Sequence, residues 1–384
     1  MKFVHISDLH LGKRLYGFSL LEDQKFILDK VIEIIDDEKP DAVLIAGDIY
    51  DKPVPLVQAV ELFDSFIVRL SARKVQTFII SGNHDSAGRL SFGGRLMDAE
   101  GVHISPAYAG KASSFSLEDE YGPVDIFLLP FLKPQTAAPF FEEEMGDYSS
   151  CLRAAIRRMD IRPGVRKVLI AHQFVTGASR SDSEEVNVGG LDNVDAAVFE
   201  DFDYVALGHI HSPQNVGDPR IRYCGTPLKY SFSEAGQKKS VTVAELGPAE
   251  SGRARLKVRT RPLSPLRDMV EIKGSYDRLV STAFYQDLDR EAYYHVTLTD
   301  EDDILGALGR MRTVYPNIMN LDYDNKRTRA VLEMDRLPDP VQETPLDTFM
   351  EFYQNVNGTP MSQEQRKVCG DLIEKIWQEG GEKL

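Results

Sequence analysis

The sequence is poor in cysteine. Cys151, Cys224 and Cys369 are the only three in 384 residues, and no two of them form a Cys-x-x-Cys pair. Three scattered cysteines exclude a disulfide framework, which needs paired residues. We therefore expect a reducing compartment, the cytoplasm.

Long apolar runs and an excess of positive charge are also missing. The first residues, MKFVHISD, have a strand pattern, and no stretch approaches the length of a membrane-spanning helix. We expect neither a signal peptide nor a membrane span. The net charge of −15 excludes a protein that coats nucleic acid by bulk electrostatics. A polyanionic partner would need local basic patches, or metal ions that supply the positive charge.

What the chain does contain is enough apolar residues, 42%, for two or three packed domains. Apolar runs predict strands at KFVHI, AVLIA, QTFII, DIFLLP, KVLIAH and DYVALG. Helical spacing predicts helices over 20–38, 55–72, 148–160 and 194–201. Apolar strands that alternate with amphipathic helices indicate an α/β fold whose sheet is buried on both faces. The polar residues 173–193 predict a surface loop.

The composition changes near residue 250. Arg255, Lys257 and Arg259 alternate with small or apolar residues, so they share one face of a predicted strand. This basic face could lie along a DNA backbone, and the alternative is a solvated edge strand protected by its charge. A smaller unit with strands and helices follows over 267–335. Two amphipathic helices end the chain over 340–384, and Ser362 with Gln365 predicts a capping box for the second.

Potential metal ligands follow the predicted strands. They are Asp8, His10, Asp48, Asn83, His172, His209 and His211. Sites in open α/β sheets assemble at the carboxyl ends of strands. His209 and His211 point to the same side of an extended chain, although two hydrogen-bonded loop histidines would give the same pattern. Oxygen and imidazole ligands without thiolate suit Mn²⁺ foremost, or Mg²⁺. Seven ligands are too many for one ion and natural for two.

The motifs HISDLHLG, AGDIYD, SGNHDS and ALGHIH, in this order, resemble the calcineurin-like metallophosphoesterase superfamily. Together with RYCGTPLKYSF they are most similar to the SbcD family, the D subunits of bacterial SbcCD nucleases. The resemblance is specific over residues 1–240 and weaker beyond. It implies a two-sheet sandwich flanked by helices as the nuclease domain (1–262), a small α+β DNA-capping domain (267–335) and a helix-loop-helix partner-binding tail (340–384).

The resemblance also implies a function. The expected protein is a two-metal DNA nuclease, a double-strand exonuclease and single-strand or hairpin endonuclease, in DNA repair, recombination and replication. Its expected partner is an SbcC-type coiled-coil ATPase, in a nucleoid-associated heterotetramer that contains a homodimer of this chain. The 55–72 helix and residues 86–99 would form the dimer. One alternative is a metallophosphoesterase for small phosphodiesters or phosphomonoesters, and another is a non-catalytic scaffold. GDIYDKP lacks the Asp-Arg-Gly of phosphoprotein phosphatases, which counts against that branch.

Residue roles follow from the same resemblance. Asp48 would bridge two metals, the first completed by Asp8, His10 and His211 and the second by Asn83, His172 and His209. His84 would stabilise the transition state or protonate the leaving oxygen, unless it merely supports a ligand.

Three further residues have possible roles beside these ligands. We hypothesise that Asp51 holds the His84 imidazole and favours its cationic form. The alternative is that Asp51 caps the turn before Pro53. Lys13 and Arg14 are placed to meet a phosphate, or else lie on a solvated loop.

Overall fold

The computed structural model describes residues 1–142, 146–184, 193–250, 252–329, 345–357 and 359–380. The chain divides into two compact units. The first comprises residues 1–299 and 304–322, and the second comprises residues 300–303 and 323–384.

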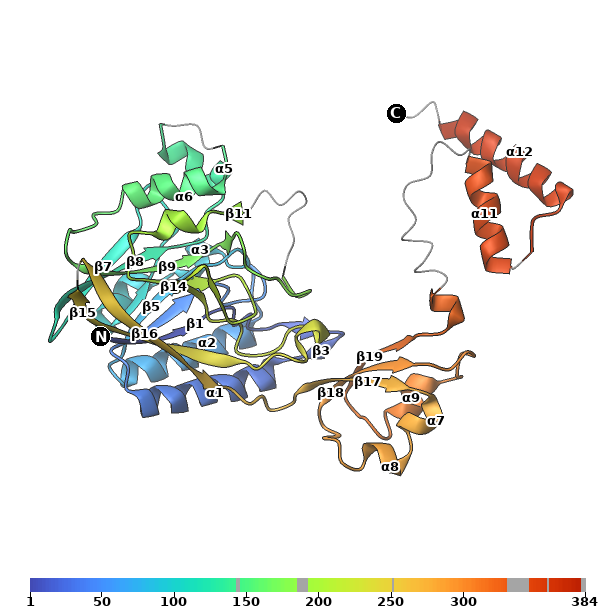
Figure 1. Cartoon of the computed structure of the whole chain (residues 1–384), viewed down its shortest axis with the longest axis horizontal. Coiled ribbons are helices and arrows are strands. Elements are labelled where there is room, and N and C mark those ends of the chain that lie inside the picture. The colour runs from blue at the N-terminus through green and yellow to red at the C-terminus, as the bar shows by residue number, and fades with distance from the viewer. Residues whose placement is uncertain (143–145, 185–192, 251, 330–344, 358, 381–384) are drawn as a thin grey trace. The chain divides into compact units, whose positions relative to one another are not determined.

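Two six-stranded sheets form the body of the first unit (Figure 1). The first runs in the order β16 (Arg253–Pro262), β15 (Ser240–Glu250), β1 (Lys2–Ile6), β4 (Ala42–Ala46), β5 (Gln76–Ile80) and β6 (Val102–Ile104). The second runs in the order β13 (Gln214–Val216), β14 (Asp218–Tyr223), β12 (Tyr204–Gly208), β9 (Arg166–His172), β8 (Gly122–Leu129) and β7 (Ser113–Asp119). The central strands of each sheet are parallel, so their carboxyl ends share an edge.

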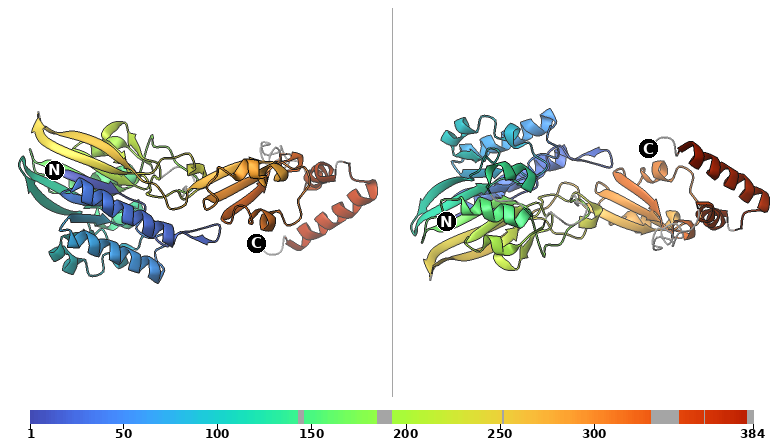
Figure 2. Two further views of the ribbon diagram at one scale, coloured as in Figure 1. Left: turned by 90° about the horizontal axis from the view of Figure 1, so that it is seen from below. Right: turned by 90° about the horizontal axis from the view of Figure 1, so that it is seen from above.

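Apolar side chains of both sheets pack face to face. Phe3, Leu44 and Phe78 from the first sheet join Ile126 and Ile170 from the second in one buried cluster. Helices cover the outer faces, with α1 (Leu21–Glu38) and α2 (Val57–Ala72) on the first sheet and α6 (Tyr148–Arg157) on the second (Figures 1 and 2). This arrangement confirms the predicted sandwich flanked by helices.

Short elements complete the sandwich. They are β2 (Arg14–Leu15), β3 (Phe18–Ser19), α3 (Ala87–Leu90), α4 (Gly94–Met97), η1 (Asp98–Glu100), α5 (Pro134–Ala137), η2 (Ala138–Phe140), β10 (Phe174–Val175), β11 (Asn193–Val194), η3 (Ala196–Phe199) and η4 (Phe232–Glu234). The helix predicted over 194–201 is wrong in length and type, because only the 3₁₀ helix η3 forms in the short span between β11 and β12.

A three-stranded sheet follows the sandwich. It has the order β17 (Met269–Gly274), β18 (Tyr293–Leu298) and β19 (Ile318–Tyr323), with α7 (Tyr276–Leu279), α8 (Thr282–Tyr285) and α9 (Ala307–Met311) in its connections. Tyr293 donates to the Asp23 carboxylate of α1 at 2.7 Å, and the Arg267 guanidinium bonds the same group. These contacts hold the small sheet to the sandwich.

The second unit contains a helix pair, α11 (Pro345–Asn357) and α12 (Gln363–Gly380) (Figure 2). Ser362 and Gln365 exchange hydrogen bonds at 2.9 and 3.2 Å, so the predicted capping box is confirmed. The domain boundaries at 262 and 267 stay a prediction, and those at 335 and 340 lie outside the described residues. Of the helices that the structure describes, none combines the length and apolarity that crossing a membrane requires.

Candidate metal centre

A glycine precedes a predicted ligand at three strand ends. Gly47 comes before Asp48, Gly82 before Asn83 and Gly208 before His209. A Cβ on Gly47 would lie 2.4 Å from His172 Nδ1, and one on Gly82 would lie 2.1 Å from Asp48 Oδ1. The glycines are therefore needed because the side chains of neighbouring strand ends fill the space that a Cβ would occupy.

The backbone at the strand ends is strained. Asp8, His10, Asp48 and His209 have φ values of 54°, 41°, 49° and 100°, in a region that residues other than glycine rarely adopt. Such strain costs roughly 1–3 kcal/mol per residue and persists only where the surroundings enforce it, as at functional sites. Here all four strained residues are themselves predicted ligands.

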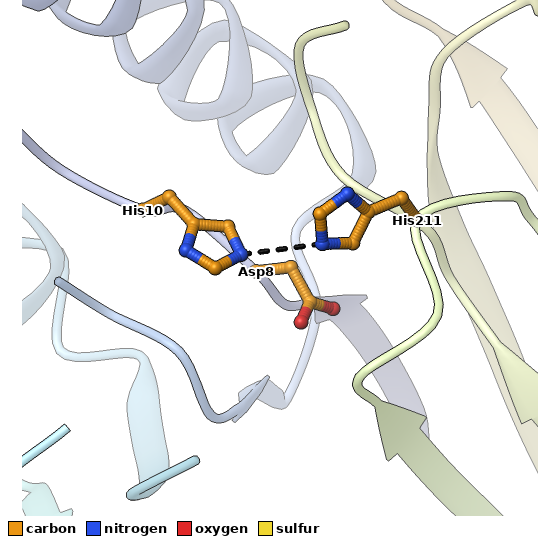
Figure 3. Close-up of side chains that lie close together, drawn as sticks. All are labelled: Asp8, His10 and His211. Carbon is orange, nitrogen blue, oxygen red and sulfur yellow. Dashed lines mark hydrogen bonds between the residues drawn. The ribbon is translucent and has the colours of Figure 1, made fainter. Parts of the chain in front are cut away.

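The first group of predicted ligands joins the ends of β1 and β12. His10 Nε2 lies 3.2 Å from His211 Nε2, and both face the Asp8 carboxylate (Figure 3). One ligand atom from each of these three residues lies within 4.8 Å of the other two. All three side chains are buried.

The second group lies on the other side of Asp48. Asn83 Oδ1 lies 3.0 Å from His172 Nε2 and 3.0 Å from His209 Nδ1. The Asp48 carboxylate lies between the two groups, with Oδ2 at 3.3 Å from His172 Nε2 and 3.8 Å from His10 Nε2. All seven predicted ligands thus converge on one edge of the two sheets.

Burial and charge set the protonation of this centre. Burial lowers the pKa of His209 to about 3, assisted by the neighbouring His172. Burial opposes ionisation of Asp48, but the charges of the surrounding histidines and a hydrogen bond from His172 together outweigh it, so the pKa of Asp48 falls well below its ordinary value. Burial likewise opposes the charged form of His172, but the Asp48 carboxylate outweighs it and raises the pKa of His172 to about 9.

The donor set fits divalent metal ions. Two carboxylates, one amide oxygen and four imidazoles meet in a mostly buried site. Carboxylate and imidazole suit hard or borderline cations, and no cysteine belongs to any of the described clusters of candidate ligands. The buried carboxylates of Asp8 and Asp48 repel one another when both are ionised, and cations between them would offset this unfavourable electrostatic free energy.

His84 lies at the rim of the same centre. Its Nε2 is 3.9 Å from Asp48 Oδ2, and its side chain is 19% exposed, whereas His10 and His172 are almost fully buried. The geometry also groups His84 with His10 and Asp48 as potential ligands of one ion, so its assignment to catalysis stays a prediction. Its Nδ1 lies 3.2 Å from the Asp51 backbone carbonyl.

The side chain of Asp51 has a cationic partner. Its Oδ1 accepts from Lys13 Nζ at 2.7 Å and lies 3.9 Å from His10 Nδ1. The His84 ring bonds the main chain of Asp51, so a role of the Asp51 carboxylate on His84 stays a prediction. Lys13 lies beside the centre, and Arg14 bonds the Gly17 carbonyl within the β2–β3 hairpin.

The other predicted DNA contacts lie on β16, the edge strand of the first sheet. Lys257 is paired with Glu245 of β15, and Glu245 is paired with Lys2 at the amino end of β1. The metal centre lies at the carboxyl end of β1, so Lys257 lies towards the other end of the sheet. The Arg259 guanidinium bonds the carboxylates of Glu38 and Glu245. The edge position fits the alternative of a charged edge strand, and a DNA contact by Arg255, Lys257 or Arg259 stays a prediction.

Several buried or half-buried polar residues at the centre had no predicted role. The Asp85 carboxylate accepts from the backbone N–H groups of Ile49, Tyr50 and Gly82, which fixes the two strand ends that carry Asp48 and Asn83. Ser183, Glu184, Glu234 and Lys239 surround His211. Asp85 belongs to the conspicuous run GNHD, but the others lie in polar segments with no periodic signal.

Comparison with known proteins gives family matches over most of the chain. Residues 1–213 match the calcineurin-like phosphoesterase family, and residues 265–357 match a family described as the type 5 capsule protein repressor C-terminal domain. The D subunit of the SbcCD nuclease from Staphylococcus epidermidis is 32% identical over 387 residues, which cover 98% of this chain and 99% of the relative.

Solved structures match more weakly. A dimetal phosphatase from Danio rerio is 12% identical, with a TM-score of 0.38 over 69% of this chain and 99% of its own. The protein TT1561 of Thermus thermophilus is 14% identical, with a TM-score of 0.34 over 62% of this chain and 92% of its own.

Proposed function

Because the chain belongs to the calcineurin-like phosphoesterase family and, over nearly its whole length, to the SbcD family of nuclease subunits, we propose that it is a metal-dependent DNA nuclease. The observation that carries this proposal is the convergence of seven oxygen and imidazole ligands, namely Asp48 and the six side chains around it. The relative that matches over 99% of its own length is named a nuclease, which supports DNA phosphodiesters as the substrate.

Two divalent cations, Mn²⁺ foremost, would be held by these residues. Asp8, His10 and His211 would hold one, Asn83, His172 and His209 the other, and Asp48 would bridge them. When bound, such ions act as Lewis acids, lower the pKa of water and stabilise the attacking and leaving oxygens of a phosphodiester. Around them, Asp85 holds the strand ends in register and the burial of the ligands excludes bulk water.

His84 would act on the substrate rather than on the metals. Its side chain is 19% exposed, whereas those of His10 and His172 are at most 2% exposed, so a substrate can reach it. The Asp51 carbonyl accepts from Nδ1, which leaves Nε2 to face the centre. A protonated Nε2 could donate to a non-bridging or leaving oxygen of the phosphate.

The remaining proposals concern the partners. Exposed apolar residues on one face of α11, namely Phe349, Phe352 and Val356, support docking of the tail on an SbcC-type coiled-coil ATPase. Val57 and Val60 of α2 are exposed, and so are Phe92 and Leu96 of the segment 86–99, which supports the proposed homodimer. A heterotetramer of this kind would act on cytoplasmic, nucleoid-associated DNA.

The dimer proposal has a direct test. Phe92→Asp places a charge on a side chain that is 85% exposed in the single chain, so it should leave the fold intact. In light scattering after size exclusion, the wild type should elute as a dimer and the variant as a monomer. A monomeric wild type contradicts the dimer.

The nuclease proposal is tested by Mn²⁺-dependent cleavage of end-labelled duplex and hairpin DNA, alongside a chromogenic phosphodiester. His84→Ala should lose cleavage while still binding Mn²⁺, because His84 is assigned to the substrate. Loss of Mn²⁺ binding in that variant would instead make His84 a ligand. If only the chromogenic diester is cut, with or without the ATPase, the substrate is a small phosphoester and the nuclease proposal fails.

A further inference from the structure

His211 is held at three points by segments far away in the chain. Its backbone N–H donates to Glu184 Oε1 at 2.6 Å, and its carbonyl accepts from Lys239 Nζ at 2.9 Å. Its ring Nδ1 lies 2.5 Å from Ser183 Oγ. Both the main chain and the ring of this predicted ligand are therefore fixed from outside its own strand.

The direction of the hydrogen bonds at Ser183 follows from its partners. The hydroxyl has a single proton, and it lies against Glu234 Oε1, an ionised carboxylate oxygen that only accepts. Ser183 Oγ must then accept from His211 Nδ1–H. In the form that can bind a metal, the single ring proton is then on Nδ1, and the lone pair is on Nε2, which faces His10 Nε2 at 3.2 Å.

A buried ion pair keeps the carboxylate in place. Glu234 is fully buried, Lys239 is 5% exposed, and Lys239 Nζ lies 2.5 Å from Glu234 Oε2. Lys239 also donates to Thr226 Oγ1 at 2.8 Å. Removal of the cation would leave a buried carboxylate without a charged partner, which is unfavourable, so the position of Glu234 depends on Lys239.

We propose that Ser183, Glu234 and Lys239 form a positioning relay that sets the tautomer of His211 and thereby the metal affinity of the group Asp8, His10 and His211. The inference rests on the proposed two-metal function and deepens it. Partners of this kind around a ligand histidine typically change metal affinity by ~10- to 100-fold when removed. The relay also assigns Ser183, and with it the polar segment in which it lies, a role at the metal centre.

The test is a Mn²⁺ titration of the full chain, in which electron paramagnetic resonance measures free Mn²⁺. Ser183→Ala removes the acceptor of His211 Nδ1–H, and Ser183→Thr keeps a hydroxyl. Ser179→Ala is the matched control, because Ser179 is exposed on the same loop and only its backbone contacts Gln214. We expect two equivalents in the wild type, with one of them weakened ~10- to 100-fold in Ser183→Ala alone.

Each outcome decides the matter. Equal binding of both equivalents by Ser183→Ala and the wild type overturns the relay and leaves the two-metal function standing. A wild type that binds no pair of Mn²⁺ ions overturns both. If Ser183→Ala does not fold, the histidine ¹⁵N spectrum of the metal-free wild type decides, with His211→Gln to assign the signal. A proton on Nε2 rather than Nδ1 of His211 overturns the relay.

Discussion

Replacing Gly208 by alanine tests why the ligand-bearing strands end in glycine. Gly208 is the last residue of β12 and precedes His209. A Cβ at this position would lie 1.9 Å from the Ala46 carbonyl oxygen and 2.7 Å from His172 Nδ1. The same two atoms form a hydrogen bond of 2.8 Å with each other. Alanine must therefore separate the ends of β12 and β4 or break this bond.

The expected cost has two parts. Relief of the clash needs a shift of about 1.5 Å at a backbone carbonyl, and overpacking of this kind costs typically ~1–3 kcal/mol. Loss of the bond would leave His172 Nδ1 and the Ala46 carbonyl unsatisfied in a buried place, which costs ~1–3 kcal/mol. We expect Gly208→Ala to lower the free energy of unfolding by about 3 kcal/mol, and to weaken Mn²⁺ binding because His172 moves.

Urea unfolding followed by circular dichroism measures the first effect, and Mn²⁺ titration measures the second. Gly309→Ala in α9 is the control, because nothing lies within 4 Å of its Cβ. Alanine in a helix should stabilise that variant by ~0.5–1 kcal/mol. The reasoning is refuted if Gly208→Ala unfolds within ~0.5 kcal/mol of the wild type, the range of neutral surface changes, and binds Mn²⁺ equally well.

Three more predictions concern other parts of the chain. Hydrogen bonds from Arg259 lower the pKa of Glu38 from 4.5 to about 2, so this carboxylate stabilises the fold above pH 4.5 and the contribution is lost as the pH falls towards 2. In urea unfolding between about pH 2 and 6, the free energy of unfolding of Glu38→Gln should therefore decrease less with falling pH than that of the wild type. Asp51→Asn should lower turnover roughly tenfold or more and shift its pH profile, since it removes a charge near His84, whereas an unchanged profile from about pH 6 to 9 would assign Asp51 to the turn. Deletion of residues 340–384 should spare Mn²⁺-dependent cleavage and weaken binding to the coiled-coil ATPase at least ~100-fold in calorimetry, and retained binding would contradict a docking role for the tail.

The pattern of residues by itself determined the buried strands and the edge on which the site lies, whereas the two-sheet sandwich was expected from the resemblance to a known family. Strands of a sheet covered on both faces must be apolar throughout, so they stand out as short runs such as AVLIA and DYVALG. Parallel strands end at a common edge, so the polar residues after each run, from Asp8 to His211, were expected to meet there. The structure brings all seven predicted ligands together at that edge. They could be predicted because both the apolar runs and the polar residues that follow them can be recognised in short segments of the chain.

Tertiary structure alone decided which other residues reach that edge. Ser183 and Glu234 are 51 residues apart and lie in polar segments without periodicity, yet both are bonded around His211. In the sequence, the alternating charges of β16 likewise indicate a solvated basic face. In the structure, Arg259 instead bonds Glu38, 221 residues away. Such polar contacts depend on the three-dimensional approach of single atoms, within about 3 Å. Local patterns of hydrophobicity contain no information about that approach.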